Sequence, residues 1–312
     1  MCEYEIISTD SHLEVAPDAW RPYVDSEFRR FTPQVVKLAN GGDAWLMPGN
    51  DSPVPLGLNF SAGRGFENLK VSGISYADGL VGAGDGEQRL REMDEDGVDA
   101  EVLFPAVAGQ RTLDTGALPA EAYVAVELDV PITAHVSFGG CAAAEGAARQ
   151  REAAETGESL MNFAPINAML SKVASHGFVA NQLITSGVFD RVPGLQFFFA
   201  ETQVGWIPEF MEDADENYSR HRFWSGLDLP HAPSWYVRNH FSWGFQIDRF
   251  GLKVRGDIGV DRMQWSTDFP HVQCDWPNSR KVIDEQFSGL PDGDRRMILR
   301  DNAIRYFRLD RG

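Results

Sequence analysis

The chain has 312 residues, of which 43% are hydrophobic and 24% are charged, and its formal net charge is −18. This composition is ordinary for a globular protein with a substantial core, whereas the negative charge disfavours nucleic acid and anionic membranes as partners. The sequence has no apolar run near the ~20 residues that a membrane span requires, and three cysteines without close pairing predict a reducing compartment. We therefore expect a cytoplasmic protein that binds neither nucleic acid nor membrane.

Strand-like and helix-like segments alternate along much of the chain. The first strand is expected at residues 4–9, and residues 17–80 then form an excursion rich in glycine and proline. Within it, Asn40-Gly41-Gly42-Asp43 between two apolar runs predicts a β-hairpin, and the stretch that follows predicts a loop or lid. The further elements expected are a helix at 87–96 ended by Gly97, a strand at 98–104, a helix at 117–128, a strand at 131–136, a helix at about 157–187, a strand at 195–201, a helix at 206–218, strands at 241–246 and 263–267, and a helix at 295–307.

This alternation predicts a parallel α/β sheet, and a TIM-type barrel is favoured over a doubly wound sheet. No GxGxxG motif follows an early strand, which argues against a dinucleotide-binding domain. We predict one domain over residues 1–312, with residues 17–80 as an insertion or lid.

Acidic and imidazole side chains follow four of the predicted strands. They are Asp10 with His12, His135, Glu201 and Asp268. Because a parallel barrel collects its chemistry at the C-terminal ends of its strands, we expect these side chains to meet around one divalent metal ion. Asp10 and His12 share one face of their strand, since side chains alternate with period two. Imidazole together with carboxylate suits zinc, manganese or iron better than calcium.

The same side chains also have structural interpretations. The pair on the first strand could cap the strand end, Asp268 could begin a turn, and His135 could be a core histidine bonded to backbone. Glu201 follows an apolar strand, where an unpaired carboxylate would be costly. It must therefore face a metal ion, water or a cation such as Arg64 or Arg238.

Several motifs occur in a characteristic order along the chain. They are Thr9-Asp10-Ser11-His12, Met93-Asp94-Glu95-Asp96-Gly97-Val98-Asp99, Pro131-Ile132-Thr133-Ala134-His135, Ser186-Gly187-Val188-Phe189 with Pro193-Gly194-Leu195, Glu201 ahead of Gly205-Trp206-Ile207-Pro208, and Ser266-Thr267-Asp268-Phe269-Pro270-His271 followed by Trp276-Pro277. Taken together, these motifs resemble the amidohydrolase superfamily, in the branch that includes aminocarboxymuconate-semialdehyde decarboxylase and related aromatic-acid decarboxylases. The resemblance implies a distorted (β/α)8 barrel that holds one divalent ion at its mouth through Asp10, His12, His135 and Asp268, without an organic cofactor. Zinc is expected first, with manganese and iron as alternatives.

The resemblance also implies roles for further residues. Asp268 and Glu201 are the expected acid/base groups, although many members of the superfamily have a histidine where this chain has Glu201. His271 is expected to line the pocket or to orient a ligand, and Arg64 to bind the substrate.

The chain is short in one place. A complete barrel would have two more βα units between the strands at 98–104 and 131–136, but residues 105–130 leave room for one helix. The third and fourth units are therefore expected to be missing or remodelled. The sheet edge that this leaves needs cover from the insertion or from a second copy, and we expect a homodimer.

The function that we expect is metal-dependent, non-oxidative decarboxylation of a small aromatic or unsaturated carboxylic acid, which makes the protein a carbon–carbon lyase. An acidic residue rather than histidine at position 10 is similar to what decarboxylating members of the superfamily have. Two alternatives stay open: hydrolysis of an ester, lactone or amide at the same site, and a barrel remnant with impaired catalysis.

Overall fold

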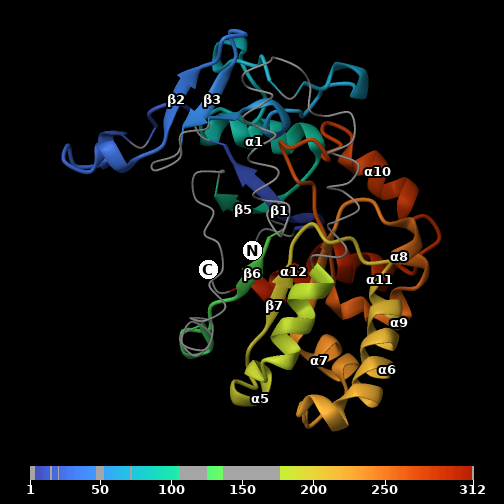
Figure 1. The fold of residues 1–312 in the computed structure, drawn as a ribbon. Helices are drawn as coiled ribbons and strands as arrows, with labels where there is room; N and C mark the ends of the chain where they lie inside the picture. The colour runs from blue at the N-terminus through green and yellow to red at the C-terminus, as the bar shows by residue number, and fades with distance from the viewer. Residues whose placement is uncertain are drawn as a thin grey trace.

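A computed structural model of the protein describes residues 4–14, 16–19, 21–46, 53–70, 72–105, 125–135 and 176–310 (Figure 1). Most of the predicted helix at 117–128 and the first part of the helix at about 157–187 lie outside these residues. Cys2 and Cys141 also lie outside them, and Cys274 is a free thiol.

Six parallel strands form the frame of the described part of the chain. β1 (Ile7–Leu13) pairs with β5 (Ala100–Pro105), whereas β6 (Ile132–Ala134), β7 (Phe197–Phe199), β8 (Phe241–Phe245) and β9 (Met263–Trp265) follow one another in a second sheet. Beyond the end of β9, the Asp268 N–H donates to the Asp10 carbonyl (2.9 Å) and the His12 N–H to the Phe269 carbonyl (2.7 Å). These bonds place the first strand beside the last one.

The resulting strand order is β5-β1-β9-β8-β7-β6, in which successive parallel strands lie side by side except β5 and β6, and the first strand lies beside the last. This is the order of a TIM-type barrel and not of a doubly wound sheet. Within the described residues, β5 and β6 do not pair, so the strands form an open arc. The ends of these two strands nevertheless meet at the mouth, where the rings of Phe104 and His135 lie 5.1 Å apart.

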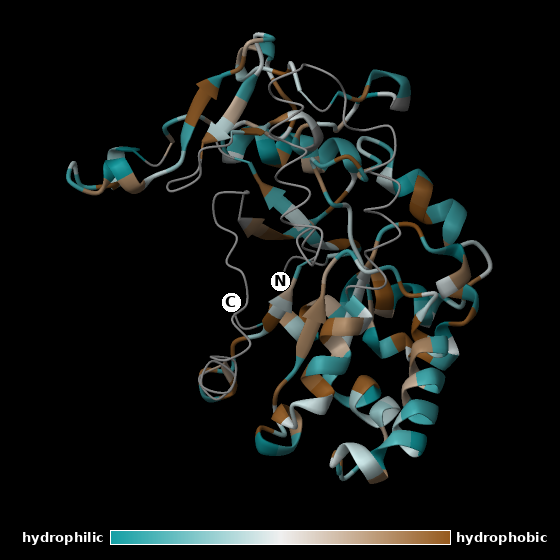
Figure 2. Cartoon of the chain, viewed as in Figure 1, coloured by the Kyte–Doolittle hydropathy of each residue, from teal (hydrophilic) through white to brown (hydrophobic). Residues whose placement is uncertain are grey.

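The sheet packs its outward residues against a layer of helices. Phe199 and Trp243 stack at 4.8 Å, and both lie in one buried cluster with Ile207 and Met211 of α6 (Ile207–Ser225). Figure 2 shows that α6 is largely hydrophilic over much of its length, as expected for an outer helix, whereas β7 is hydrophobic. The predicted apolar face of this helix is therefore core, but the helix extends seven residues beyond the predicted end.

The other helices surround the arc. α1 (Gly86–Asp96) ends as predicted, because Gly97 adopts the left-handed conformation (φ 72°). Within the described residues, none of the helices combines the length and apolar character that crossing a bilayer requires. Apart from short 3-10 turns, the remaining helical segments among the described residues are 125–127, 176–185, α5 (Val188–Arg191), α7 (Pro233–His240), α8 (Arg249–Lys253), α9 (Arg255–Ile258), α10 (Ser279–Gln286), α11 (Asp292–Arg296), a π-helical turn (Met297–Asp301) and α12 (Asn302–Phe307).

The insertion has a small core of its own. β2 (Gln34–Lys37) and β3 (Asp43–Leu46) form the predicted hairpin, and β4 (Val54–Pro55) adds a third strand. Figure 1 shows this sheet beside α1. The insertion reaches the mouth of the arc, because the N–H groups of Ser61 and Ala62 donate to the Pro270 carbonyl (3.0 and 3.1 Å). Its hydrophobic core consists of Trp45, Leu56, Phe60, Ile74 and Leu80.

The C-terminal helix connects both ends of the second sheet. The Asn302 amide donates to the Met263 carbonyl on β9 (2.8 Å), and the Tyr306 hydroxyl donates to the Ile132 carbonyl on β6 (2.6 Å). Tyr306 also packs against Phe198, which points away from the outer helices. α12 therefore stabilises the strand at the open side of the arc.

A pH-dependent effect on stability is expected from Asp275, beside α1. Burial, and then the charge of Asp96, raise the pKa of Asp275 to about 6. The folded chain thus holds a proton that the unfolded chain releases near pH 4, so folding stability decreases as the pH rises from about 4 to 6. Asp275→Asn should stabilise the protein by ~1 kcal/mol at pH 7 and by much less at pH 4. Thermal unfolding at both pH values measures this, with the exposed Asp94→Asn as control; equal effects of D275N at both pH values would contradict it.

Candidate metal centre

Asp10, His12, His135 and Asp268 converge at the C-terminal ends of β1, β6 and β9. β1 is longer than predicted and contains both Asp10 and His12, which point to the same side. Ligand atoms about 2.1 Å from a tetrahedral ion lie roughly 3.4 Å from one another, and four donor-atom pairs here have about this spacing. The distances are 3.5 Å from Asp10 Oδ1 to His12 Nε2, 3.4 Å from Asp10 Oδ1 to His135 Nε2, 3.2 Å from His12 Nε2 to His135 Nε2, and 3.1 Å from His12 Nε2 to Asp268 Oδ1. Two overlapping groups among the described residues could hold a metal ion: Asp10 with His12 and His135, and His12 with Asp268 and His271. Asp268 therefore joins the first group through His12.

The two carboxylates of this cluster are buried. Asp10 is 0% and Asp268 1% exposed, and among the described residues neither oxygen of Asp10 nor Oδ1 of Asp268 accepts a hydrogen bond of regular geometry. Such groups are costly to bury unless a cation or hydrogen bonds compensate them. A divalent ion held by Asp10, His12 and His135, with Asp268 next to His12, would compensate these carboxylates, and such imidazole and carboxylate donors fit zinc or manganese.

His271 lies against the cluster but is poorly placed to share the ion with His12. The two rings stack at 3.6 Å with 16° between their planes. The lone pair of an imidazole nitrogen lies in the plane of its ring. Because the two rings are stacked, their lone pairs lie in separate, nearly parallel planes and cannot both point at one ion about 2 Å from each nitrogen. His271 instead directs Nδ1 at Asp268 Oδ1 (3.3 Å) and Nε2 at Glu14 Oε1 (3.4 Å).

The protonation states of the cluster suit metal binding. Burial, and then the charge of His271, lower the pKa of His12, which favours the neutral imidazole that a metal needs. Burial would raise the pKa of Asp268, but the charge of His271 and the contacts with both histidines outweigh burial and lower it well below its ordinary value. Burial would likewise lower the pKa of His271, but the charge of Asp268 and the contacts with Asp268 and Glu14 raise it to about 10.

A buried polar network supports β1 from behind. Arg89 on α1 pairs with Glu101 on β5 (2.6 Å) and donates to the His12 carbonyl (3.1 Å), while its guanidinium covers the Phe269 ring at 4.4 Å. The Ser11 hydroxyl donates to the same Glu101 (3.0 Å). This network fixes the backbone on both sides of the cluster.

Glu14 is a site residue that the sequence reading missed. It is 1% exposed, and it continues the period-two series of Asp10 and His12, which is the signal that could have identified it. Oε1 accepts a hydrogen bond from Asn59 Nδ2 in the insertion (3.3 Å). Burial, and then the charge of Glu14, raise the pKa of Tyr76, so Glu14 is also close to this insertion residue.

Glu201 and Arg64 are the two other predicted site residues, and neither belongs to the groups that could hold a metal ion among the described residues. Glu201 follows β7 in a left-handed turn (φ 61°) and is 5% exposed. Arg64 donates from Nε to the Phe60 carbonyl (3.2 Å), and Arg238 donates to the Asp257 carbonyl (2.8 Å). The roles predicted for Glu201 and Arg64 stay predictions.

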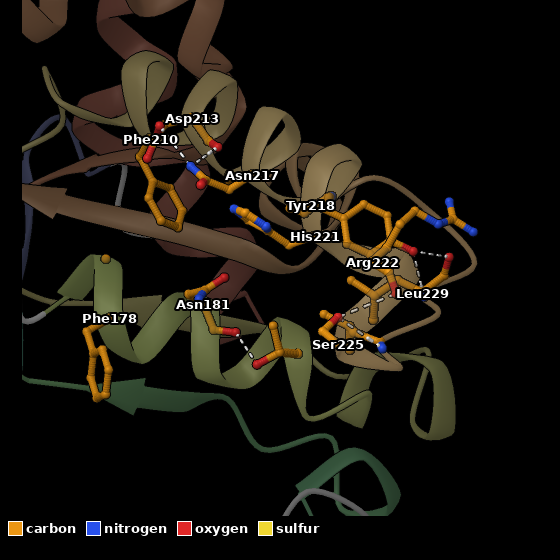
Figure 3. Close-up of a pocket in the computed structure, with 15 residues that line it drawn as sticks. Phe178, Asn181, Phe210, Asp213, Asn217, Tyr218, His221, Arg222, Ser225 and Leu229 are labelled. Carbon is orange, nitrogen blue, oxygen red and sulfur yellow. Dashed lines mark hydrogen bonds between the residues drawn. The ribbon is translucent and has the colours of Figure 1, made fainter.

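A pocket of about 390 Å³ lies elsewhere, on the outside of the helix layer (Figure 3). Figure 3 shows it between the helical residues 176–185 and α6, with Asn181 on one side and Asn217 and His221 on the other. Its polar side chains bond locally: Asn217 donates to the Asp213 carbonyl (2.8 Å), and Tyr218 bonds to the backbone of Leu229. We place the chemistry at the buried cluster because titratable groups converge there.

Comparison with known proteins agrees with this geometry. The family model for amidohydrolases matches residues 85–309. An amidohydrolase from Mycobacterium avium subsp. paratuberculosis K-10 is similar in structure (TM-score 0.69, 16% identity, 98% of this chain and 100% of that chain). So are 5-carboxyvanillate decarboxylase from Sphingomonas paucimobilis (0.53, 19%, 98% and 99%) and dihydroxybenzoic acid decarboxylase from Polaromonas sp. JS666 with bound manganese and 2-nitroresorcinol (0.52, 13%, 99% and 98%). No curated protein matches the sequence.

At these identities the solved structures show the fold alone, which is a TIM barrel. The family model covers well over half of the chain and includes the strands of the second sheet and Asp268. The chain therefore belongs to the amidohydrolase family of metal-dependent enzymes.

Proposed function

We propose that the protein is a non-oxidative decarboxylase that acts on a small aromatic or unsaturated carboxylic acid with the help of one divalent ion. The observation that carries the proposal is the coordination-like spacing of Asp10, His12 and His135, with Asp268 3.1 Å from His12 and an acidic residue at position 10. Supporting it, two of the structurally similar proteins are decarboxylases of aromatic acids, and one of these holds manganese.

Zinc is the first candidate for the ion because two imidazoles and two carboxylates are common zinc ligands, and manganese is the second. When bound, such an ion supplies positive charge that orients a substrate carboxylate or hydroxyl and stabilises developing negative charge. Iron is the third candidate.

The side chains must place a proton on the carbon that loses CO2. The C–C bond breaks, its electron pair stays on the substrate carbon, and that carbon forms a bond to the proton. Asp268 and Glu201 are the two candidate acid/base groups; because the pKa of Asp268 is lowered, Asp268 would have to take up a proton before passing it to the carbon. Arg64, at the insertion that meets Pro270, is the candidate partner for a substrate carboxylate.

The proposal includes the architecture. We propose that the chain is one domain in which six strands build the arc, that the third and fourth βα units of an eight-stranded barrel are missing, and that a second copy covers the open side in a homodimer. The cluster forms without those units, because its residues come from β1, β6 and β9. This disfavours an impaired remnant.

The test is turnover by zinc-loaded and manganese-loaded protein. Release of CO2 from at least one member of a panel of hydroxybenzoates and their methoxy and dicarboxylate derivatives is expected, and Asp10→Asn should abolish it. The family description favours hydrolysis as the second candidate. Turnover of an ester, lactone or amide panel without release of CO2 would replace the proposed reaction with hydrolysis. If the purified protein does not bind one metal ion per chain, both the decarboxylase and the hydrolase proposals are rejected.

A further inference from the structure

Glu14 has no part in the proposed reaction, yet it is among the most deeply buried charged side chains at the mouth. It is 1% exposed, and its Oε2 has no hydrogen-bond partner among the described residues. A buried carboxylate is costly unless something compensates it. The groups around Glu14 therefore have to offset the cost of burying its carboxylate.

The surroundings of Glu14 link two parts of the protein. On one side, Oε1 lies 3.4 Å from His271 Nε2. On the other, the same oxygen accepts a hydrogen bond from Asn59 (3.3 Å), at the end of a short helical turn (Gly57–Asn59) in the insertion. The segment after this turn bonds to the Pro270 carbonyl, next to His271. The insertion and the turn after β9 therefore hold Glu14 and His271 together.

A second cation between Glu14 and Asp268 is the competing explanation for this carboxylate. The ring of His271 argues against it, because its two nitrogens face the two carboxylates separately, at 3.3 Å from Asp268 and 3.4 Å from Glu14. An imidazole between two carboxylates is suited to donate to one of them through each N–H. Carboxylate–histidine contacts of this kind orient the groups that bind a metal.

We propose that Glu14 is a positioning residue. It accepts the Nε2–H of His271 and so fixes the ring flat against His12 with Nδ1 directed at Asp268, and Asn59 fixes Glu14 in turn. The insertion is then a structural part of the metal site. This inference rests on the proposed role of Asp268 as a metal ligand.

The first readout is the histidine ring itself. In zinc-loaded and in metal-free protein with ¹⁵N-labelled histidine, long-range ¹H–¹⁵N spectra should show a proton on Nε2 of His271, with the signal assigned by its loss in His271→Asn. Glu14→Gln, which keeps the shape but removes the charge, should shift this signal. The matched control is Glu92→Gln, since Glu92 is also a buried glutamate (8% exposed) but accepts bonds from Gly82 and Gln88 instead.

The second readout is zinc affinity by calorimetry. We expect one zinc per chain, about tenfold weaker binding in Glu14→Gln, a smaller loss in Asn59→Ala, and no change in Glu92→Gln. Two zinc ions per chain, falling to one in Glu14→Gln, would make Glu14 a cation ligand and overturn the proposal. Equal affinity and an unchanged ring signal in Glu14→Gln would overturn it as well.

The two readouts separate this proposal from the proposed function. Neither uses a substrate, so absence of decarboxylation leaves the role of Glu14 intact. If no zinc binds, the proposed function fails while the ring signal of the metal-free protein still tests Glu14. If Glu14→Gln does not fold, an Nε2 without a proton in the wild-type protein is sufficient to reject the inference.

Discussion

Asp268→Asn should lower turnover of any substrate by about 10²–10⁴-fold and weaken metal binding strongly. The amide has the shape of the carboxylate but removes the negative charge that faces His12 and His271. Asparagine also tolerates the left-handed backbone that Asp268 adopts (φ 59°). The substitution therefore isolates the charge, which an alanine at this position would not do.

The matched control is Asp18→Asn. Asp18 also has a left-handed backbone (φ 63°), but it lies at the surface in an ion pair with Arg21. Turnover per bound metal and the dissociation constant of zinc should be unchanged in this control. Wild-type zinc affinity in D268N, together with less than tenfold loss of turnover, would remove Asp268 from the site.

Much of the candidate site could be predicted from the sequence because it depends on strand ends. A parallel barrel places the residues that follow its strands at one mouth, so His135 and Asp268 could be expected together despite 132 intervening residues. Side chains alternate between the two faces of a strand, which predicts that Asp10 and His12 lie on the same face. The same rule extends to Glu14, but an acidic residue just past a predicted strand is ordinary at a surface. Only its burial identifies it.

Other features depend on contacts that no local pattern encodes. The stacking of His271 on His12 arises from the turn after β9, and the pairing of Arg89 with Glu101 joins a helix to a strand through their packing. Strands such as β6, β7 and β9 have three residues each, so their bounds are set by neighbouring strands and not by their own sequence. The helix α7 was missed for a similar reason: it is short, and its buried residues are defined by the sheet it covers.

Zinc or manganese should stabilise the protein against unfolding. Asp10→Asn should raise the melting temperature in chelator but lower it, relative to the wild type, in saturating metal. A ligand at 1,000 times its dissociation constant adds about 4 kcal/mol to folding stability, so chelation should lower the melting temperature by several degrees. In the chelated protein, Asp10 is a buried carboxylate with Asp268 in the same cluster and no regular hydrogen bond among the described residues. Replacing it with a neutral amide removes the cost of burying that charge.

Asp10→Asn should therefore melt at the same temperature as chelated wild-type protein or higher, and yet gain little when metal is added. Thermal unfolding with chelator and with saturating metal gives both quantities from the same samples. The contact with His12 and His135 could instead make Asp10 a net stabilising group without any ion. In that case D10N would melt lower than the wild type in chelator, and the buried carboxylates would be explained by histidine pairing alone. A raised melting point in chelator, combined with a lost response to metal, is an outcome that pairing alone does not produce.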